Sequence, residues 1–238
     1  MMTLKKWEDL PEQMRTDAVR PYYDAIYARK MGLVAKRIFD IAASVLLLVI
    51  LFPVFVLLAV AIKLDSPGPV FFRQVRVTQY GRHFRIFKFR TMVQNADKIG
   101  AQVTIGSDPR ITRVGKFIRK CRLDEICQLL NVLTGDMTFV GTRPEVPKYV
   151  AAYTPEMQAT LLLPAGITSE ASILAMDDEL LLAQAEDVDA AYISQVLPEK
   201  MRYNLDAVKH FSFWSDIRIM WRTVVAVLDT AEDEKRGA

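Results

Sequence analysis

The sequence predicts an α+β fold in which a small α/β domain, with a short β-hairpin and amphipathic interfacial helices, is joined to an apolar helix of membrane length. Three observations predict it: the uncharged run Ile41–Ile62, two strand-like segments that meet at Tyr80-Gly81, and helical apolar patterns in much of the remaining chain. With 238 residues, 51% of them hydrophobic, the chain suffices for one sizeable domain and an appended segment. We therefore expect one functional unit at a membrane.

The apolar run has the length of a membrane helix, since roughly 33 Å of α-helix matches a hydrocarbon core of roughly 30 Å. Pro53 lies near its middle and lacks a backbone donor, so it would divide the run into arms of roughly 15 to 18 Å. A spanning helix usually has its Lys/Arg excess on one side only. Here cationic residues stand on both sides: Arg29, Lys30, Lys36 and Arg37 before the run, and Lys63, Arg73, Arg76 and Arg82 after it. This favours a re-entrant helix-break-helix, with both flanks cytoplasmic, over a span, which remains the alternative.

Composition divides the chain into four parts. Residues 1–33 form an N-terminal amphipathic extension, which would lie on the membrane or pack against a partner subunit, and residues 34–64 form the re-entrant hairpin. Residues 65–230 form the cytoplasmic domain, and residues 231–238 a flexible tail.

Within the domain, Val70–Val77 and His83–Arg90 read as the two strands of the hairpin. A short helix is expected from Thr112 or Arg113 to Lys120, and Met137–Val140 is expected to be a strand. The remaining expected elements are a helix from about Asp124 to Leu133 capped by Gly135, an acidic helix over Asp177–Val188, helices within Pro198–Leu228, and an interfacial aromatic group of Phe211, Phe213, Trp214 and Trp221.

Composition also excludes some classes of site. The two cysteines, Cys121 and Cys127, have no further Cys or nearby His to complete a zinc set, and neither His83 nor His210 sits in a catalytic motif. The net charge of +3 is mild, but the basic residues cluster between positions 63 and 122. This basic half should face phosphates or anionic lipid.

The adjacent carboxylates of Asp124 and Glu125 are the strongest candidates for chemistry. Asp124 could simply be a helix N-cap, with Glu125 favouring the positive end of the helix dipole. However, cations come from three places, namely the segment before the pair, the Thr142-Arg143-Pro144 turn and the hairpin, and arginine binds phosphate oxygens bidentately. The candidate phosphate-binding residues are Arg119, Arg143, Lys88 and Arg90. A carboxylate in such surroundings can attack phosphorus, and Mg²⁺ is usually bound by one or two carboxylates plus substrate phosphates. Asp124 and Glu125 are therefore candidates both for catalysis and for binding Mg²⁺.

Several motifs, in order, resemble those of the monotopic polyprenyl-phosphate phosphoglycosyl transferases, the bacterial sugar transferase family, over about residues 34–228. The motifs are Lys36-Arg37-Ile38-Phe39-Asp40, Gly68-Pro69-Val70-Phe71-Phe72-Arg73-Gln74, Phe87-Lys88-Phe89-Arg90-Thr91-Met92, Asp108-Pro109-Arg110-Ile111-Thr112-Arg113-Val114-Gly115, Leu123-Asp124-Glu125 with Gln128-Leu129-Leu130-Asn131-Val132, Gly135-Asp136-Met137 and Gly141-Thr142-Arg143-Pro144.

The resemblance implies a phosphoglycosyl transferase that moves a phosphosugar from a UDP-sugar to undecaprenyl phosphate and releases UMP. It implies that Asp124 forms an aspartyl-phosphosugar intermediate, that Glu125 binds Mg²⁺ or activates the lipid phosphate, and that Arg119 and Arg143 hold phosphate. The family's re-entrant helix is broken by a proline, here Pro53. The implied place is the cytoplasmic face of a bacterial inner membrane, at the initiating step of glycoconjugate synthesis. The implied partners are the two substrates and membrane lipid, with a homodimer left open and no nucleic acid.

The chain departs from the family pattern at Phe52-Pro53, at Thr142-Arg143-Pro144 and at Pro164–Glu170, and the last of these leaves the sugar pocket open. Two competing hypotheses belong to other classes. In the first, basic strands with aromatic side chains grip nucleic acid or anionic lipid, although the same aromatics would serve as the core of a small sheet. In the second, the chain is an idle scaffold that recruits partners through its first 30 residues, against which the intact Asp124-Glu125 pair argues. The resemblance does not name the sugar, the pathway or the role of residues 1–33.

Overall fold

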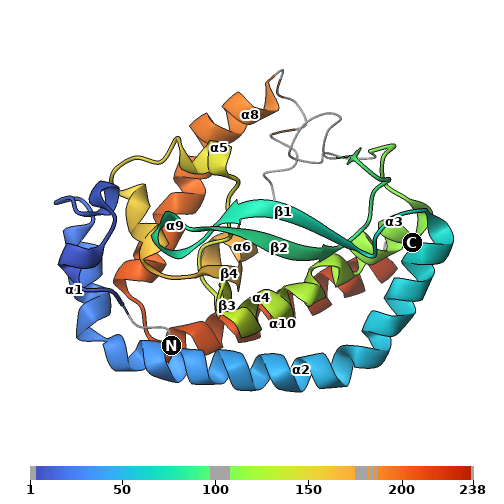
Figure 1. Ribbon diagram of the computed structural model, residues 1–238, viewed down its shortest axis with the longest axis horizontal. Coiled ribbons are helices and arrows are strands. Elements are labelled where there is room, and N and C mark those ends of the chain that lie inside the picture. Colours follow the sequence, from blue (N-terminus) through green and yellow to red (C-terminus); the bar gives the residue numbers. More distant parts are fainter. Residues whose placement is uncertain (1–3, 97–107, 175–181, 183–184, 186, 237–238) are drawn as a thin grey trace.

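The computed structural model describes residues 4–96, 108–174, 182, 185 and 187–236 (Figure 1). Its two small sheets lie above a long basal helix, and further helices surround the sheets. The helices are α1 (Arg20–Ala28), α2 (Lys30–Asp65), α3 (Arg113–Lys120), α4 (Leu129–Thr134), α5 (Pro147–Val150), α6 (Glu170–Leu174), α8 (Val188–Ala191), α9 (Leu197–Lys209) and α10 (Phe213–Arg236). The short 3-10 and π-helical turns are η1 (Trp7–Asp9), η2 (Glu12–Met14), η3 (Gln79–Gly81), η5 (Leu123–Gln128), η6 (Met157–Leu162) and η7 (Tyr192–Val196). The strands confirm the predicted α+β class: β1 (Phe71–Val77), β2 (His83–Phe89), β3 (Met137–Val140) and β4 (Ala165–Thr168).

The predicted hairpin is confirmed. β1 and β2 pair antiparallel from Phe71 opposite Phe89 to Val77 opposite His83. Tyr80 and Gly81 have positive φ values of 59° and 75°, which reverse the chain at the tip. The second sheet pairs β3 with β4 in parallel.

Two predicted helix boundaries hold in the central part of the chain, but the helix expected from about Asp124 begins at Leu129, because Leu123–Gln128 forms the 3-10 turn η5. The Thr112 side chain accepts a hydrogen bond from the Gly115 amide and so caps α3. Gly135, at φ 86°, ends α4 in the left-handed region. The acidic helix predicted over residues 177–188 lies almost entirely outside the described residues.

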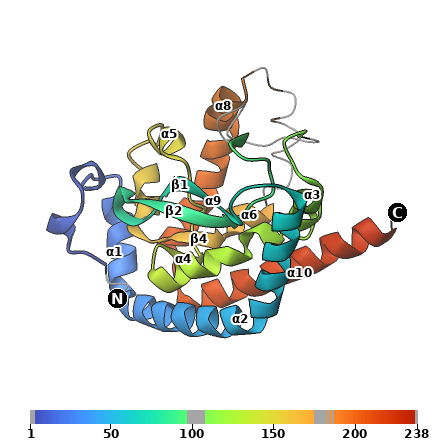
Figure 2. The same cartoon turned by 45° about the vertical axis from the view of Figure 1, so that its right-hand side comes forward.

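Helix α2 is continuous through Pro53, so the break that we predicted there is a bend within one helix (Figures 1 and 2). Proline removes one backbone hydrogen bond and crowds the preceding turn, which bends a helix without ending it. Among the described helices, α2 is the one long and apolar enough to cross a membrane. Its large apolar side chains are exposed in the monomer, for example Val49 at 69% and Leu57 at 70%. An exposed apolar surface of this length associates the protein with a membrane.

The N-terminal extension packs against the domain itself, which corrects our expectation that its apolar face would meet a membrane or a partner subunit. Met14, Val19 and Ile26 are completely buried in a core that they share with η6 and α9. Leu161 and Val208 are among the residues on the other side of this core. The apolar stripe of residues 4–29 is therefore part of the main core.

Helix α10 lies beside the first half of α2 (Figures 1 and 2), where Asp216 pairs with the buried Lys36 at 2.5 Å. Trp214 and Trp221 are exposed, as predicted for an interfacial helix, at 77% and 68%. Phe211 is buried instead, because it lies in the core of the N-terminal extension. The helix continues to Arg236, into the part expected to be a flexible tail, since residues 231–236 are mostly good helix formers.

Candidate active site

The Asp124-Glu125 pair lies in η5, a 3-10 turn that packs against β2. Arg122 enters the turn in the left-handed region at φ 54°. Neither carboxylate caps a helix: the residues before η5 and α4 are Arg122 and Gln128, and neither element has a side-chain cap. The N-cap alternative for Asp124 is therefore wrong. The turn is anchored by Cys127, which is completely buried in the core beneath the pair.

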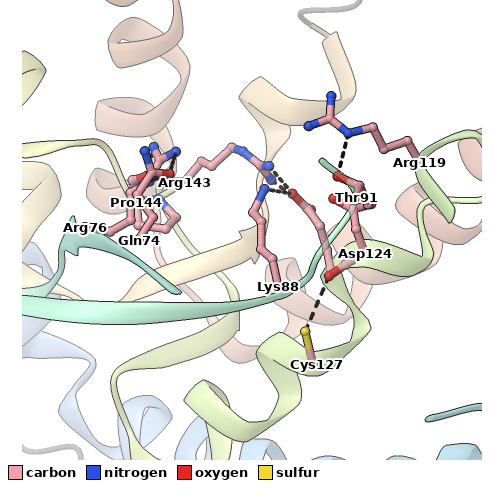
Figure 3. A network of polar contacts seen from close by, with 10 residues as sticks. Gln74, Arg76, Lys88, Thr91, Arg119, Asp124, Cys127, Arg143 and Pro144 are labelled. Carbon is pink, nitrogen blue, oxygen red and sulfur yellow. Dashed lines mark hydrogen bonds and ion pairs between the residues drawn. The ribbon is translucent and has the colours of Figure 1, made fainter. Parts of the chain in front are cut away.

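Glu125 is held by two of the predicted cations, Lys88 and Arg143, both of which are labelled in Figure 3. Lys88, from β2, donates to Oε1 of Glu125 at 2.9 Å. Arg143, from the loop after β3, donates to Oε2 at 3.2 Å and through its second terminal nitrogen to Oε1. Burial opposes ionisation of Glu125, but Arg143 and Lys88 outweigh it and hold the pKa of this carboxyl well below its usual value. Glu125 is thus an ionised, bidentate partner of Arg143.

Asp124 has a different environment. Its carboxyl group makes no side-chain hydrogen bond or ion pair with another residue in the described ranges, and Asp124 lines a cavity of about 360 Å³. Burial raises the pKa of Asp124 and Glu125 adds to this, while Lys88 and Arg119 oppose it. A carboxylate without a fixed partner at a cavity wall is available to a ligand.

The cavity is strongly cationic. Its wall is formed by β1 and the end of β2, by the segment after β2, by the end of α3 and by η5. Asp124 is the one acidic residue among its described lining residues, against six basic ones, so an anionic ligand is favoured. The basic lining residues are Arg73, Arg76, Lys88, Arg90, Arg110 and Arg119.

Three of these cations, Arg73, Arg76 and Arg110, were not among our candidates. Alternation along β1 could have suggested Arg76, because Lys88 lies opposite Phe72 and therefore shares a face of the hairpin with Gln74 and Arg76. Arg73 lies opposite Phe87, on the other face. Arg110 is partly neutralised by Asp108 at 2.5 Å. Arg119 is fixed at the wall because its Nε donates to the Thr91 hydroxyl at 2.9 Å (Figure 3).

Arg90 also lines the cavity, but its guanidinium binds the end of α2. It donates to the carbonyl oxygens of Ser66 at 2.7 Å and Pro67 at 2.8 Å, and to the Ser66 hydroxyl at 3.0 Å. Gly68 makes room for it, since a Cβ there would lie 2.0 Å from Arg90 Nη1. Arg90 thus joins the hairpin to the end of α2, and its predicted phosphate binding stays a prediction.

The hairpin aromatics form core, not a stacking platform for bases. Phe84 and Phe89 are buried at 6% and 1% exposure. Phe71 and Phe87 pack edge to face at 6.0 Å within the core beneath the end of α2. The aromatic surface that the nucleic-acid hypothesis requires is thus largely buried in the core.

The residues present fit a hard divalent cation. Asp124 and Glu125 are adjacent, and the Asp124 carboxyl group has no fixed side-chain partner among the residues described. The described ranges hold no group of three or more Asp, Glu, His or Cys side chains that could bind a metal by themselves. This pattern fits Mg²⁺, which takes one or two carboxylates and completes its shell with substrate phosphates and water.

Comparison with known proteins agrees with this geometry. The family model described as bacterial sugar transferase matches residues 31–230. The chain is 39% identical over 196 residues, 81% of its length and 43% of the relative's, to a UDP-N-acetylgalactosamine-undecaprenyl-phosphate N-acetylgalactosaminephosphotransferase of Aeromonas hydrophila.

Two further relatives are UDP-glucose:undecaprenyl-phosphate glucose-1-phosphate transferases. The one from Escherichia coli K12 is 35% identical over 90% of this chain and 44% of its own length. The one from Caulobacter vibrioides is 36% identical over 82% of this chain and 70% of its own length. The chain thus spans less than half the length of the first two relatives. Because the family model covers residues 31–230, the membrane helix and the Asp124-Glu125 site included, the chain belongs to the bacterial sugar transferase family.

Proposed function

We propose that the protein transfers a phosphosugar from a UDP-sugar to undecaprenyl phosphate, giving undecaprenyl-diphospho-sugar and UMP. One observation carries the proposal: Asp124 is the single acidic residue among the described lining of a cationic cavity and has no side-chain partner there, whereas its neighbour Glu125 is bound by Lys88 and Arg143. The printed names of the relatives support both substrates. The pair thus has one carboxylate positioned for a ligand and one that is structurally fixed.

In the proposed reaction, a carboxylate oxygen of Asp124 attacks the β-phosphorus of the UDP-sugar. The bond from that phosphorus to the bridging oxygen breaks, UMP leaves with the bridging oxygen, and the phosphosugar stays on Asp124 as an acyl phosphate. A phosphate oxygen of undecaprenyl phosphate then attacks the same phosphorus. The acyl-phosphate bond breaks, the Asp124 carboxylate is restored, and the new diphosphate joins the lipid to the sugar.

Lys88, Arg119 and Arg143 would bind and orient the phosphate oxygens, because they surround the pair from three elements. Bidentate arginines suit such oxygens better than single-point cations do. Mg²⁺, held by Asp124 and Glu125 together with substrate oxygens, would neutralise charge on the diphosphate.

Glu125 suits an anchor for Arg143 better than a proton acceptor, and it would bind Mg²⁺ only beside the hydrogen bonds that it already accepts. Both of its carboxylate oxygens already accept hydrogen bonds from cationic donors. Its pKa is well below the usual value because these cations outweigh the effect of burial. A carboxylate of such low basicity is a poor general base near neutral pH.

We further propose that α2 is re-entrant and that the site faces the cytoplasm at a bacterial inner membrane, where the reaction would initiate glycoconjugate synthesis. The bend in α2, the cationic residues before and after its apolar run, and the contact of Arg90 with its end support this topology. The end of α2 is also tied to the domain by Asp65, which accepts a hydrogen bond from the Val114 amide at 2.9 Å. Both ends of the helix then belong on the side of the domain.

The test is release of UMP by nanodisc-held protein with Mg²⁺, undecaprenyl phosphate and a panel of UDP-sugars. The panel includes UDP-glucose and UDP-N-acetylgalactosamine, because the relatives' names differ in the sugar. We expect at least one UDP-sugar to give UMP in wild-type protein and none to do so in Asp124→Asn. Absence of UMP across the panel would reject the proposal.

A further inference from the structure

The loop from Gly141 to Val146 carries Arg143 and is bound along its backbone. The Gly141 amide donates to the Thr168 carbonyl at 2.9 Å, and the Thr142 carbonyl accepts from the Gly166 amide at 2.9 Å. Beyond Arg143, Nη1 of Arg76 donates to the Pro144 carbonyl at 3.1 Å (Figure 3). These contacts fix the path of the loop on one side, towards the two sheets.

On its other side the loop is held by a buried side-chain contact. Glu145, two residues after Arg143, accepts a hydrogen bond from the Tyr192 hydroxyl at 2.5 Å. Both residues are buried, with exposures of 8% and 6%. A hydrogen bond to a buried carboxylate is among the stronger kinds, and leaving such a group unpaired is costly.

Tyr192 lies in a distinctive local structure. It opens η7, a π-helical turn between α8 and α9. Such turns are rare and occur frequently at functional sites. Its ring stacks on Tyr149 at 4.5 Å, which restricts its orientation. Burial and the neighbouring Glu145 raise the pKa of Tyr192, so its hydroxyl remains a donor.

Neither Tyr192 nor Glu145 lines the cavity, so any effect on the reaction must pass through a neighbour. Arg143, two residues before Glu145, is that neighbour: it does not line the cavity itself, but it binds both carboxylate oxygens of Glu125, the residue next to Asp124 at the cavity wall. Arg76 lies on the same side and reaches both the Pro144 carbonyl and the cavity wall. The link therefore runs from Tyr192 through Glu145 to the arginine that holds Glu125.

We propose that Tyr192 is a positioning residue, whose hydrogen bond to Glu145 sets the Arg143 loop and thereby aims the Arg143 guanidinium at Glu125 and at the substrate diphosphate. The inference rests on the proposed transfer reaction for its catalytic consequence, but not for the loop geometry. It assigns a role at the active site to the π-helical segment, which sequence motifs around Asp124 do not include.

The chain offers a matched control. Tyr149 belongs to the same core cluster, stacks on Tyr192 and also donates its hydroxyl to a carboxylate, Asp189, at 2.5 Å. The Asp189 carboxylate also pairs with Lys148. Neither of these two contacts of Asp189 involves a residue of the Arg143 loop. Tyr149→Phe therefore removes the same kind of group from the same core without touching the proposed link.

The first arm is amide hydrogen exchange of the full-length protein in nanodiscs, which does not depend on turnover. Three amides report on the loop, because Gly141 donates from it to Thr168, and Gly166 and Val77 donate to its Thr142 and Glu145 carbonyls. In Tyr192→Phe, we expect these three amides to exchange about tenfold faster, the equivalent of about 1.4 kcal/mol in local opening. In Tyr149→Phe they should exchange at the wild-type rate. Equal exchange in the two variants would overturn the inference.

The second arm is the UMP-release assay. We expect kcat/KM for the UDP-sugar to fall about tenfold in Tyr192→Phe and less than about twofold in Tyr149→Phe, with Tm values lowered equally in both. The Tyr192→Phe/Glu145→Gln double variant should be no worse than the poorer single variant, because both changes cut one link. If the losses in kcat/KM of the two single variants multiply in the double variant, the two changes act independently and a positioning role is contradicted. A larger fall in Tm for Tyr192→Phe than for Tyr149→Phe would also contradict it, because the loss of activity would then follow the loss of stability. Wild-type protein that releases no UMP would reject the proposed function instead, and the exchange arm would still decide the inference.

Discussion

Arg143 donates from both terminal nitrogens to the two carboxylate oxygens of Glu125, 18 residues earlier in the chain. Lys88 shares one of these oxygens, while the adjacent Asp124 has no comparable partner among the described residues. Two neighbouring carboxylates therefore differ because cationic side chains form hydrogen bonds with Glu125, whereas they surround Asp124 without binding it. This asymmetry supports our proposal that Asp124, of the two, is the carboxylate that meets the substrate.

Replacing Arg143 by Lys should show that its two-pronged contact matters. Lysine keeps the charge but cannot bind both Glu125 oxygens, so we expect kcat/KM to fall by about 10- to 100-fold, the equivalent of one or two lost charge-assisted hydrogen bonds. The control is Arg82→Lys, because Arg82 is an exposed cation that pairs with Asp136 at 2.8 Å. UMP release should be unchanged in that control, and an equal loss in both variants would contradict a specific role for Arg143.

Arg90→Met should lower stability more than it lowers substrate affinity. The change leaves the carbonyls of Ser66 and Pro67 without their donor. We expect a loss of about 3 kcal/mol, or a fall in Tm of roughly 6 to 12 °C, in a thermal unfolding scan. Arg73→Met is the counterpart: Arg73 is exposed at the cavity wall, so its loss should weaken UDP-sugar binding and leave Tm almost unchanged. The reverse pattern would mean that Arg90 binds substrate.

Gly115→Ala should destabilise the cavity wall. A Cβ at Gly115 would lie 2.0 Å from the Thr91 carbonyl oxygen, and Thr91 holds Arg119. Overpacking of this kind costs about 1 to 3 kcal/mol or more, so both Tm and UMP release should fall. At Gly32, a Cβ would meet Phe211 at 3.4 Å, an ordinary contact, and Gly32→Ala should be tolerated. Wild-type behaviour of Gly115→Ala would show that α3 does not pack against Thr91 as described.

The two cysteines should differ in reactivity. Burial raises the pKa of Cys127 to about 12, whereas Cys121 is exposed. At pH 8, iodoacetamide should therefore modify Cys121 in folded protein and reach Cys127 only after denaturation, as read by peptide mass spectrometry. Cys121→Ser protein should remain unmodified under native conditions. Rapid labelling of Cys127 would indicate that the core beneath η5 is open.

The sequence predicted the elements that depend on local signals. Gly81 and the apolar alternation specify the hairpin, and Gly135 specifies the end of α4 because each adopts a positive φ. The cations Lys88 and Arg143 were also placed correctly beside the carboxylate pair.

Other features depend on tertiary contacts that periodicity does not specify. An apolar stripe on residues 4–29 predicts burial but not the surface that covers it, which is formed here by η6 and α9. Likewise, a conspicuous arginine in a strand does not reveal whether it meets substrate or, as Arg90 does, the carbonyls at a helix end. The continuity of α2 through Pro53 has the same origin, since a proline weakens a helix by an amount that surrounding packing can offset.

The most direct test of the central claim is to locate the phosphosugar on the protein. Wild-type protein is incubated with Mg²⁺ and an accepted UDP-sugar in the absence of undecaprenyl phosphate, quenched in acid, and digested for mass spectrometry. We predict one phosphosugar on the peptide that contains Asp124, lost when undecaprenyl phosphate is added and absent from Asp124→Asn protein. An adduct on another residue, or one that persists in Asp124→Asn, would contradict the assignment of Asp124 as the nucleophile.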